Sequence, residues 1–134
     1  MEQTLVLLKP DCVRRKLMGR VISRIEDAEL KIIAMRMIRP TERVLAIHYS
    51  EHIEKDWYQG MEQSMLEGDL VAMVVKGRGA ITVMRKLAGP SDGMEAPAGT
   101  IRGDFCVSGR YNIIHASDGQ VAARKEIHLW FPEM

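Results

Sequence analysis

Cysteine is scarce in this sequence: only Cys12 and Cys106 occur among 134 residues. They lie far apart and match no spacing that is used for metal ligands. The sequence therefore predicts neither a structural zinc site nor a disulfide framework, and a domain of this length can bury a core without them. We favour buried thiols in a reducing compartment, with a disulfide or a catalytic thiol as the alternatives.

Long hydrophobic runs and net charge are also lacking. The first apolar run, Leu5 to Leu8, is too short for a signal sequence or a membrane span, so we expect a cytoplasmic protein. The formal net charge of +1 gives no reason to expect binding to nucleic acid or to a membrane. Neither common glycine-rich phosphate loop is present, so any bound nucleotide would have to be held by side-chain cations.

The length of 134 residues and the lack of a linker long enough to divide domains predict a single domain over residues 1–134. We expect strands at 4–8, 31–39, 70–75 and 112–114, and helices at 17–30, 42–49, 57–67, 80–88 and 117–130. This order predicts an α+β fold, a ferredoxin-like βαββαβ sandwich whose four-stranded antiparallel sheet is covered by helices on one face. The first and third strands are the most apolar and should lie in the middle. An open parallel doubly wound sheet fits less well, because short elements would leave its edges uncovered.

The strongest chemical signal lies around His115. A predicted strand ends at this histidine, and Ser117 is the expected N-cap of the last helix, with Gln120 in the capping-box position. An imidazole at that point would lie near a helix N-terminus, where anions are favoured. The alternative is a histidine that simply ends a strand.

Glu126 falls on the apolar arc of the last predicted helix. A carboxylate on a core-facing stripe needs a hydrogen-bond partner, which His115 or Ser117 could supply. A carboxylate beside an imidazole raises its basicity and fixes its orientation, which suits a nucleophile or a general base. The alternative is a partly exposed glutamate in a salt bridge.

Three cationic side chains lie next to turns or glycine-rich segments: Lys9, Arg85 and Arg102. Arginine can approach phosphate oxygens in a bidentate manner, so these residues are candidates for anion binding. Taken singly, each is also compatible with a solvated surface charge.

Several segments together resemble one protein family. The segment 112–118, Asn-Ile-Ile-His-Ala-Ser-Asp, resembles the active-site motif of nucleoside diphosphate kinases. Further segments match that family in order and spacing, so the resemblance extends over essentially the whole chain: Lys9-Pro10-Asp11, His48-Tyr49, 99–105 and 125–131. The resemblance implies a ping-pong reaction, in which a nucleoside triphosphate gives its γ-phosphoryl group to His115 and a nucleoside diphosphate then takes it.

The resemblance also implies a role for each matching residue. His115 would be the nucleophile, Glu126 and Ser117 would hold its ring, and Trp57 would stack on the base. Which ring nitrogen reacts is left open. The remaining positions that would contact phosphate or sugar are Lys9, Tyr49, His52, Arg85, Ser91, Arg102 and Asn112. Mg²⁺ would be held mainly by nucleotide phosphates and water. The partners would be nucleoside di- and triphosphates and further copies of the chain, in a hexamer or tetramer built from dimers.

Three positions depart from the usual family pattern. Cys12 stands where a small residue is common, and Ser91 replaces a threonine but keeps the hydroxyl group. Gly109 stands where valine often covers the base, which would loosen the base clamp. Two alternatives remain: a nucleic-acid-binding module, disfavoured by an aromatic content of 5%, and a catalytically silent regulatory relative, disfavoured by the intact catalytic positions.

Overall fold

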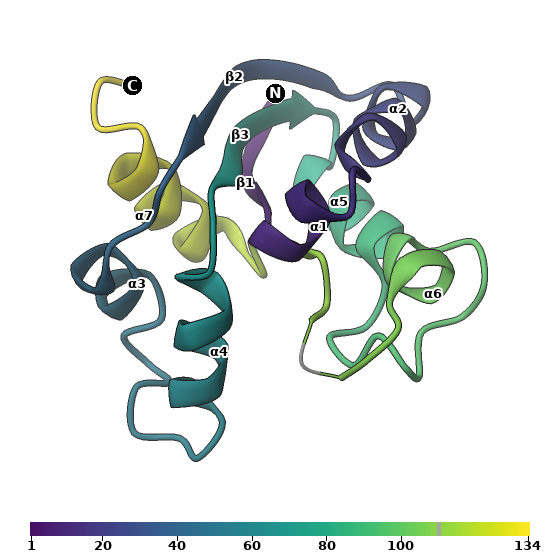
Figure 1. The fold of residues 1–134 in the computed structure, drawn as a ribbon. Helices are drawn as coiled ribbons and strands as arrows, with labels where there is room; N and C mark the ends of the chain where they lie inside the picture. Colours follow the sequence, from purple (N-terminus) through teal and green to yellow (C-terminus); the bar gives the residue numbers. More distant parts are fainter. Residues whose placement is uncertain (110) are drawn as a thin grey trace.

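A computed structural model describes residues 1–109 and 111–134 of the chain (Figure 1). The elements follow the order β1 (Glu2–Leu8), α1 (Pro10–Arg14), α2 (Met18–Asp27), β2 (Lys31–Ile38), α3 (Glu42–His48), α4 (Tyr58–Met65), β3 (Leu70–Gly77), α5 (Ala80–Ala88), α6 (Ile101–Phe105), β4 (Ile114–Ala116) and α7 (Gln120–Trp130). The described residues contain no helix that is both long and apolar enough to cross a membrane.

The strands form one four-stranded sheet in the order β2-β3-β1-β4, with every neighbouring pair antiparallel. The expected ferredoxin-like arrangement is confirmed, with β1 and β3 in the middle, α2 linking β1 to β2 and α5 linking β3 to β4. Their position explains their sequences, because a strand covered on both faces reads as a continuous apolar run.

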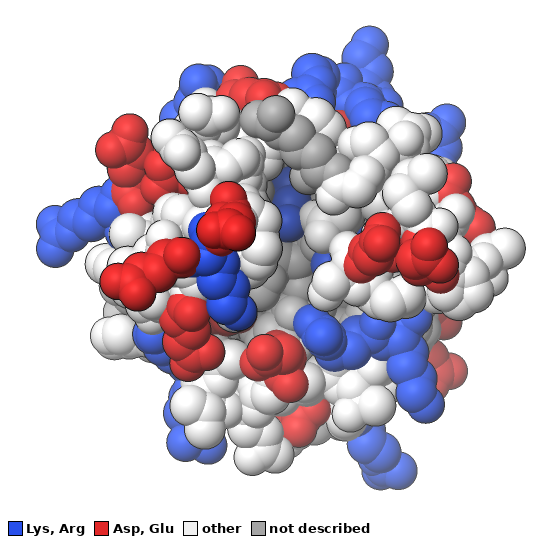
Figure 2. Space-filling model, turned by 90° about the horizontal axis from the view of Figure 1, so that it is seen from below, with Lys and Arg blue, Asp and Glu red and all other residues white. Residues whose placement is uncertain are grey.

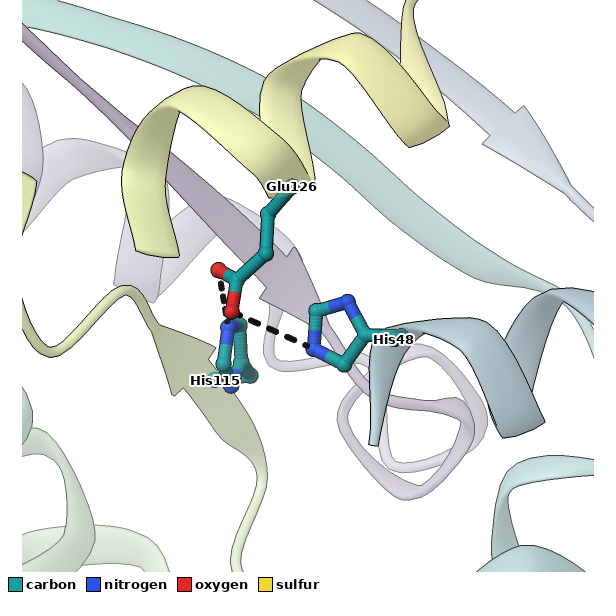
Figure 3. Close-up of side chains that lie close together, drawn as sticks. All are labelled: His48, His115 and Glu126. Carbon is teal, nitrogen blue, oxygen red and sulfur yellow. Dashed lines mark hydrogen bonds and ion pairs between the residues drawn. The ribbon is translucent and has the colours of Figure 1, made fainter. Parts of the chain in front are cut away.

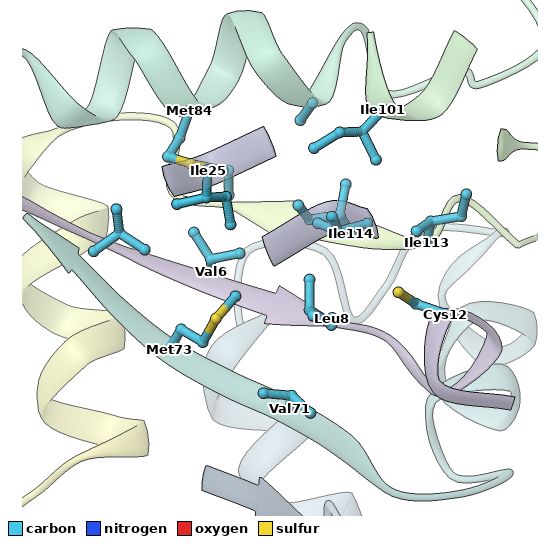
Figure 4. Packing of buried hydrophobic residues seen from close by; sticks show 14 of the residues in the cluster. Val6, Leu8, Cys12, Ile25, Val71, Met73, Met84, Ile101, Ile113 and Ile114 are labelled. Carbon is cyan, nitrogen blue, oxygen red and sulfur yellow. The ribbon is translucent and has the colours of Figure 1, made fainter. Parts of the chain in front are cut away.

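Helices cover both faces of the sheet, so the expectation that they cover one face is wrong (Figure 1). Val6 and Leu8 of β1 point into a core with residues of α2 and α5, part of which appears in Figure 4. Leu5 and Leu7 point the other way, into a second core with residues of α3, α4 and α7. Side chains alternate along a strand, so the unbroken apolar run of β1 serves both cores.

Local sequence signals located several helices correctly. The helix predicted over residues 80–88 is α5, and Thr41 caps α3 by accepting a hydrogen bond from the Val44 N–H at 3.2 Å. Two short helices were missed. α1 follows Lys9 where a turn was expected, and it begins at Pro10, whose fixed φ suits the first turn of a helix. α6 is capped by the Thr100 side chain.

The last strand lies two residues later than predicted, at Ile114–Ala116 instead of 112–114. The cause is a tight turn, in which the Ile114 N–H donates to the Asn112 carbonyl at 2.7 Å and Ile113 has a φ of +73°. Positive φ is costly for a β-branched residue, so this turn could not be predicted from the residue types. His115 therefore lies in the middle of β4, opposite Leu7 of β1.

The predicted cap of the last helix is also wrong. α7 begins at Gln120 after an extended Gly119, and no side chain caps it. Ser117 lies before the helix and is fully buried. Its hydroxyl binds Glu126 instead of capping the helix.

Candidate active site

A cleft of about 1010 Å³ opens where β1 and β4 meet the α3–α4 segment and α7. Figure 2 views the molecule from below and shows this hollow, with Lys or Arg side chains visible in its depth. Apart from Ser117, which lies beneath Glu126, all the predicted site residues line it: Lys9, Tyr49, His52, Trp57, Arg85, Ser91, Arg102, Asn112, His115 and Glu126.

Glu126 anchors the ring of His115. The Nε2 of His115 lies 2.9 Å from Oε1 of Glu126, so in the neutral ring this nitrogen carries the proton and donates it (Figure 3). No hydrogen bond from the described residues ends on Nδ1 of His115, which therefore keeps a free lone pair. Burial lowers the pKa of His115 to about 3, and the nearby charges of Lys9 and Arg102 add to this effect. The ring is uncharged at neutral pH.

Ser117 completes this anchor. Its hydroxyl donates to the same Oε1 atom of Glu126 at 2.7 Å and accepts from the Leu5 N–H at 3.2 Å. Glu126 is 8% exposed, and burial raises the pKa of its carboxyl group, while His48 and the Ser117 hydroxyl oppose the rise. The two partners that the sequence left as alternatives for Glu126 therefore both bind it.

His48 is a neighbour of this cluster that belongs to a matching segment of the sequence but was given no role there. Its Nε2 lies 3.9 Å from Oε2 of Glu126, and its ring centroid lies 4.5 Å from that of His115. Its burial could have been predicted from the sequence, because His48 lies three residues after Leu45 and therefore on the same apolar face of α3.

His48, His115 and Glu126 offer ligand atoms within 4.8 Å of one another, a spacing that a metal ion could use. The donors do not suit a metal, however. Trp130 Nε1 donates to Nδ1 of His48 at 2.9 Å, so the neutral ring carries its proton on Nε2, the atom that faces Glu126. We therefore interpret the cluster as two neutral imidazoles beside one carboxylate, in which His115 is hydrogen-bonded to Glu126 and His48 is not.

The three predicted cations are held in place by the protein. Lys9 Nζ donates to Oδ1 of Asn112 at 2.7 Å, and burial together with the Arg102 charge lowers the pKa of Lys9 to about 8. Arg102 is 4% exposed and donates to the Ile114, Gly89 and Asn112 carbonyls at 2.6, 2.7 and 3.3 Å. Arg85 donates to the Ala116 carbonyl at 3.2 Å. These contacts hold the strand that carries His115. Arg102 is buried and Lys9 is half-buried, whereas Arg85 is exposed.

Besides Nε2 of His48, two polar atoms of residues that line the cleft have no partner among the described residues. The Tyr49 hydroxyl and Nδ1 of His52 are buried and make no hydrogen bond to the described residues. Buried polar atoms are normally satisfied, so these atoms are ready to bind a ligand or water.

Trp57 lies at the cleft and is 50% exposed. Its ring centroid is 5.2 Å from that of His52, and Lys55 Nζ is 5.7 Å from the indole centroid. Ser91 uses its carbonyl to accept from Nδ2 of Asn112 at 3.1 Å. The indole and the Ser91 side chain thus both lie where a ligand in the cleft could reach them.

Both cysteines are free thiols, so the disulfide alternative is wrong. Burial raises the pKa of Cys12 to about 12, and it also raises the pKa of Cys106. A thiol that stays protonated at neutral pH is a poor nucleophile, which argues against a catalytic thiol.

Comparisons with known proteins agree on one family. The family model described as "Nucleoside diphosphate kinase" matches residues 2–134. A nucleoside diphosphate kinase of Cutibacterium acnes is 47% identical over 133 residues, covering 99% of this chain and 96% of the relative. One from Thermobifida fusca is 48% identical over 134 residues, covering 100% of this chain and 99% of the relative.

Solved structures give the same result. The apo nucleoside diphosphate kinase of Encephalitozoon cuniculi superposes with a TM-score of 0.95 at 40% identity, covering 98% of this chain and 89% of that one. The halophilic enzyme of Halobacterium salinarum in complex with CDP has a TM-score of 0.95 at 37% identity, covering 97% of this chain and 87% of that one.

Proposed function

This chain belongs to the nucleoside diphosphate kinase family, and on that premise we propose that it transfers the γ-phosphoryl group of a nucleoside triphosphate to a nucleoside diphosphate through a phosphohistidine on His115. In the first half-reaction, Nδ1 of His115 attacks the γ-phosphorus and the bond to the bridging oxygen breaks. The diphosphate leaves with the electron pair of that bond. In the second, a β-phosphate oxygen of another diphosphate attacks the phosphorus, and the bond to Nδ1 breaks.

The observation that supports this proposal most directly is the state of the His115 ring. Its Nε2 donates to Glu126 at 2.9 Å, which leaves the Nδ1 lone pair for the phosphorus. With a pKa of about 3, the ring needs no deprotonation before it attacks. The assignment of Nδ1 as the reacting nitrogen follows from the Nε2 contact.

Glu126 and Ser117 act on the ring as it reacts. The imidazole gains positive charge when it binds the phosphoryl group, and the carboxylate of Glu126 stabilises that charge through the Nε2–H bond. Ser117 keeps the reacting orientation by binding the same carboxylate oxygen at 2.7 Å. The two residues thus position the nucleophile without being consumed.

The substrate would be held by side chains that converge on the cleft. Lys9, Arg85 and Arg102 supply positive charge for the phosphate oxygens, which phosphoryl transfer requires more than covalent activation. The Tyr49 hydroxyl and Nδ1 of His52, which have no partner among the described residues, would supply hydrogen bonds. The remaining proposed contacts to phosphate, sugar and base are those of Ser91, Asn112 and Trp57.

We also propose Mg²⁺ as the cofactor. The floor of the cleft is cationic, so a cage of protein ligands does not fit there, whereas an ion carried by the nucleotide phosphates does. Glu51, Asp92 and Asp118 line the same cleft, and their carboxylates could hold water molecules of the ion. When bound, the ion would neutralise charge on the phosphates.

The partners that we propose beyond nucleotides are further copies of the chain, in a hexamer or tetramer built from dimers. β2 is an eight-residue strand at one edge of the sheet, and its Met35 and Met37 are 55% and 52% exposed. An exposed edge with apolar side chains favours pairing with a second copy. Changing both methionines to lysine should lower the mass measured by sedimentation, and an unchanged assembly would exclude β2 as the contact.

The core arrangement supports a single domain over residues 1–134, because both apolar clusters share the strands of one sheet. We propose a cytoplasmic location, where two free cysteines stay reduced and nucleotides are abundant.

Labelling with γ-³²P-ATP in the absence of acceptor tests the proposal. The wild type should form an acid-labile, base-stable phosphoprotein that added GDP discharges. His115→Ala should form none, whereas His128→Ala, at an exposed histidine of α7, should label normally. Equal labelling of His115→Ala would show that another residue is the nucleophile.

A further inference from the structure

His48 is a buried titratable residue that the mechanism above does not use. It is the last residue of α3 and is 8% exposed. Its ring contacts Trp130 of α7. It also faces His115 and Glu126, as Figure 3 shows. Such a residue either fills space in the core or acts on its neighbours.

One tautomer of His48 is fixed by the fold. The Trp130 indole N–H donates to Nδ1 at 2.9 Å, which requires a lone pair on that atom. Burial lowers the pKa of His48 to about 3, and the nearby His115 adds to this effect, so the ring holds one proton only. That proton is on Nε2, which points at Oε2 of Glu126 from 3.9 Å and has no hydrogen-bond partner among the described residues.

The two oxygens of Glu126 are used unequally. Oε1 accepts from both His115 and Ser117, at 2.9 and 2.7 Å. Among the described contacts of Oε2, the only polar hydrogen nearby is that of His48, at a distance that is too long for a hydrogen bond. A movement of about 1 Å would bring the two atoms into hydrogen-bond range.

We propose that His48 is a positioning residue for phosphoryl transfer, whose Nε2–H holds the Glu126 carboxylate ionised and turned toward His115 while that ring carries the phosphoryl group. The inference rests on the proposed function of His115. When the phosphorylated ring of His115 draws negative charge from Oε1 of Glu126, the Nε2–H of His48 moves into hydrogen-bond distance of Oε2. A histidine of the other tautomer would present a lone pair to the carboxylate and repel it. The hydrogen bond from Trp130, which selects the Nε2–H tautomer, is therefore required for this role.

Other charged groups face the same cluster and stay in place when His48 is changed. The groups that act on the titration of Glu126 or His48 are His115, Lys9, Arg85 and Lys125, together with the Ser117 hydroxyl. A change in pH dependence on substitution of His48 alone therefore reports the loss of its N–H.

The test compares His48→Phe, which keeps a ring but loses both nitrogens, with His48→Gln, whose amide has a donor and an acceptor. Single-turnover phosphoenzyme formation from ATP is followed from pH 4.5 to 8. We expect a rate about 10-fold lower in His48→Phe, with little change in nucleotide affinity, because only the orientation of the nucleophile is lost. The acid limb of the rate–pH profile should move to higher pH, because the pKa of Glu126 rises when the N–H of His48 is lost. His48→Gln should restore most of the rate and the position of the limb.

His128→Gln is the matched control, because that histidine is exposed on the outer side of α7. The nucleotide's own titration is common to all variants and cancels in the comparison. A wild-type rate and acid limb in His48→Phe would overturn the inference, as would a uniform loss of rate at every pH that His48→Gln does not restore. Absence of a phosphoenzyme in the wild type would instead overturn the proposed function.

A measurement on the wild type covers the case in which His48→Phe does not fold. Nitrogen-15 NMR of labelled histidine should show His48 as a neutral Nε2–H tautomer at pH 8. Its N–H proton should move downfield when His115 is phosphorylated, because the bond to Oε2 shortens. An Nδ1–H tautomer, or an N–H resonance that does not move, would overturn the inference.

Discussion

Substitution of Ser117 by alanine separates the chemical role of the buried network from its structural role. The Ser117 side chain is fully buried, and its hydroxyl serves two partners at once. It donates to Glu126 at 2.7 Å and accepts from the backbone N–H of Leu5 at 3.2 Å. The variant removes one oxygen atom and leaves both partners in place.

The expected loss of stability follows from these two contacts. A hydrogen bond to a charged group is worth about 1.5–3 kcal/mol, and a buried N–H left unsatisfied costs about 1–3 kcal/mol. The Leu5 carbonyl pairs with the Ser117 N–H, so the Leu5 amide faces β4 and loses its acceptor in the variant. Allowing for some relaxation, we expect Ser117→Ala to lose about 3 kcal/mol, or about 10 °C in Tm for a chain of this size.

The loss should depend on pH. Burial raises the pKa of Glu126, and the Ser117 hydroxyl opposes that rise, so the bond contributes fully only where the carboxylate is ionised. The difference between variant and wild type should therefore be largest at neutral pH and shrink as pH falls through the pKa of Glu126. Phosphoenzyme formation should slow about 10-fold, since the carboxylate that orients His115 loses a partner.

Urea unfolding at fixed protein concentration measures the stability, and rapid-quench labelling measures the rate. Ser50→Ala is the matched control for stability, because among the described contacts the exposed Ser50 hydroxyl only accepts from Lys125 at 3.1 Å, and a loss of at most about 0.5 kcal/mol is expected there. A loss below about 0.5 kcal/mol in Ser117→Ala, with a normal rate, would refute the reasoning.

Three further predictions concern other parts of the site and the fold. The pKa of Lys9 is lowered to about 8, so kcat/KM should be high below that pH and fall as pH rises through it. Lys9→Arg should move this alkaline limb of the profile to higher pH. An unchanged pH profile would exclude Lys9 as its source. Trp57→Ala should weaken nucleotide binding by about 10- to 100-fold for purines and pyrimidines alike, as measured by calorimetry, with kcat nearly unchanged. Thr41→Ala should lower stability by about 1 kcal/mol through loss of the α3 cap, with transfer rates at the wild-type level. A large rate effect would show that this cap also sets the position of the site residues on α3.

Local patterns in the sequence were sufficient for most of the fold. The apolar runs of β1 and β3 predicted the two central strands, and helical spacing located α2, because burial of an element leaves a short-range period in its sequence. The turn at Ile113 was not predictable, because nothing in a β-branched residue indicates a positive φ. Long-range contacts hold Ile113 in this conformation, among them the Lys9 N–H, which donates to the Ile113 carbonyl at 2.8 Å.

In the candidate site, too, some features follow from the sequence and others from long-range contacts. A glutamate on the apolar arc of the last helix needs a buried partner, and this physical requirement was sufficient to link Glu126 to His115 or Ser117 from the sequence. Tertiary structure decided that both bind the same oxygen, that Nε2 of His115 is the nitrogen engaged, and that His48 faces the other oxygen. Those facts depend on the register of β4 against β1 and on how α3 and α7 pack, since atoms distant in sequence meet only through these contacts. Periodicity encodes which residues are buried, whereas the pairing of buried polar atoms is set by the assembled fold.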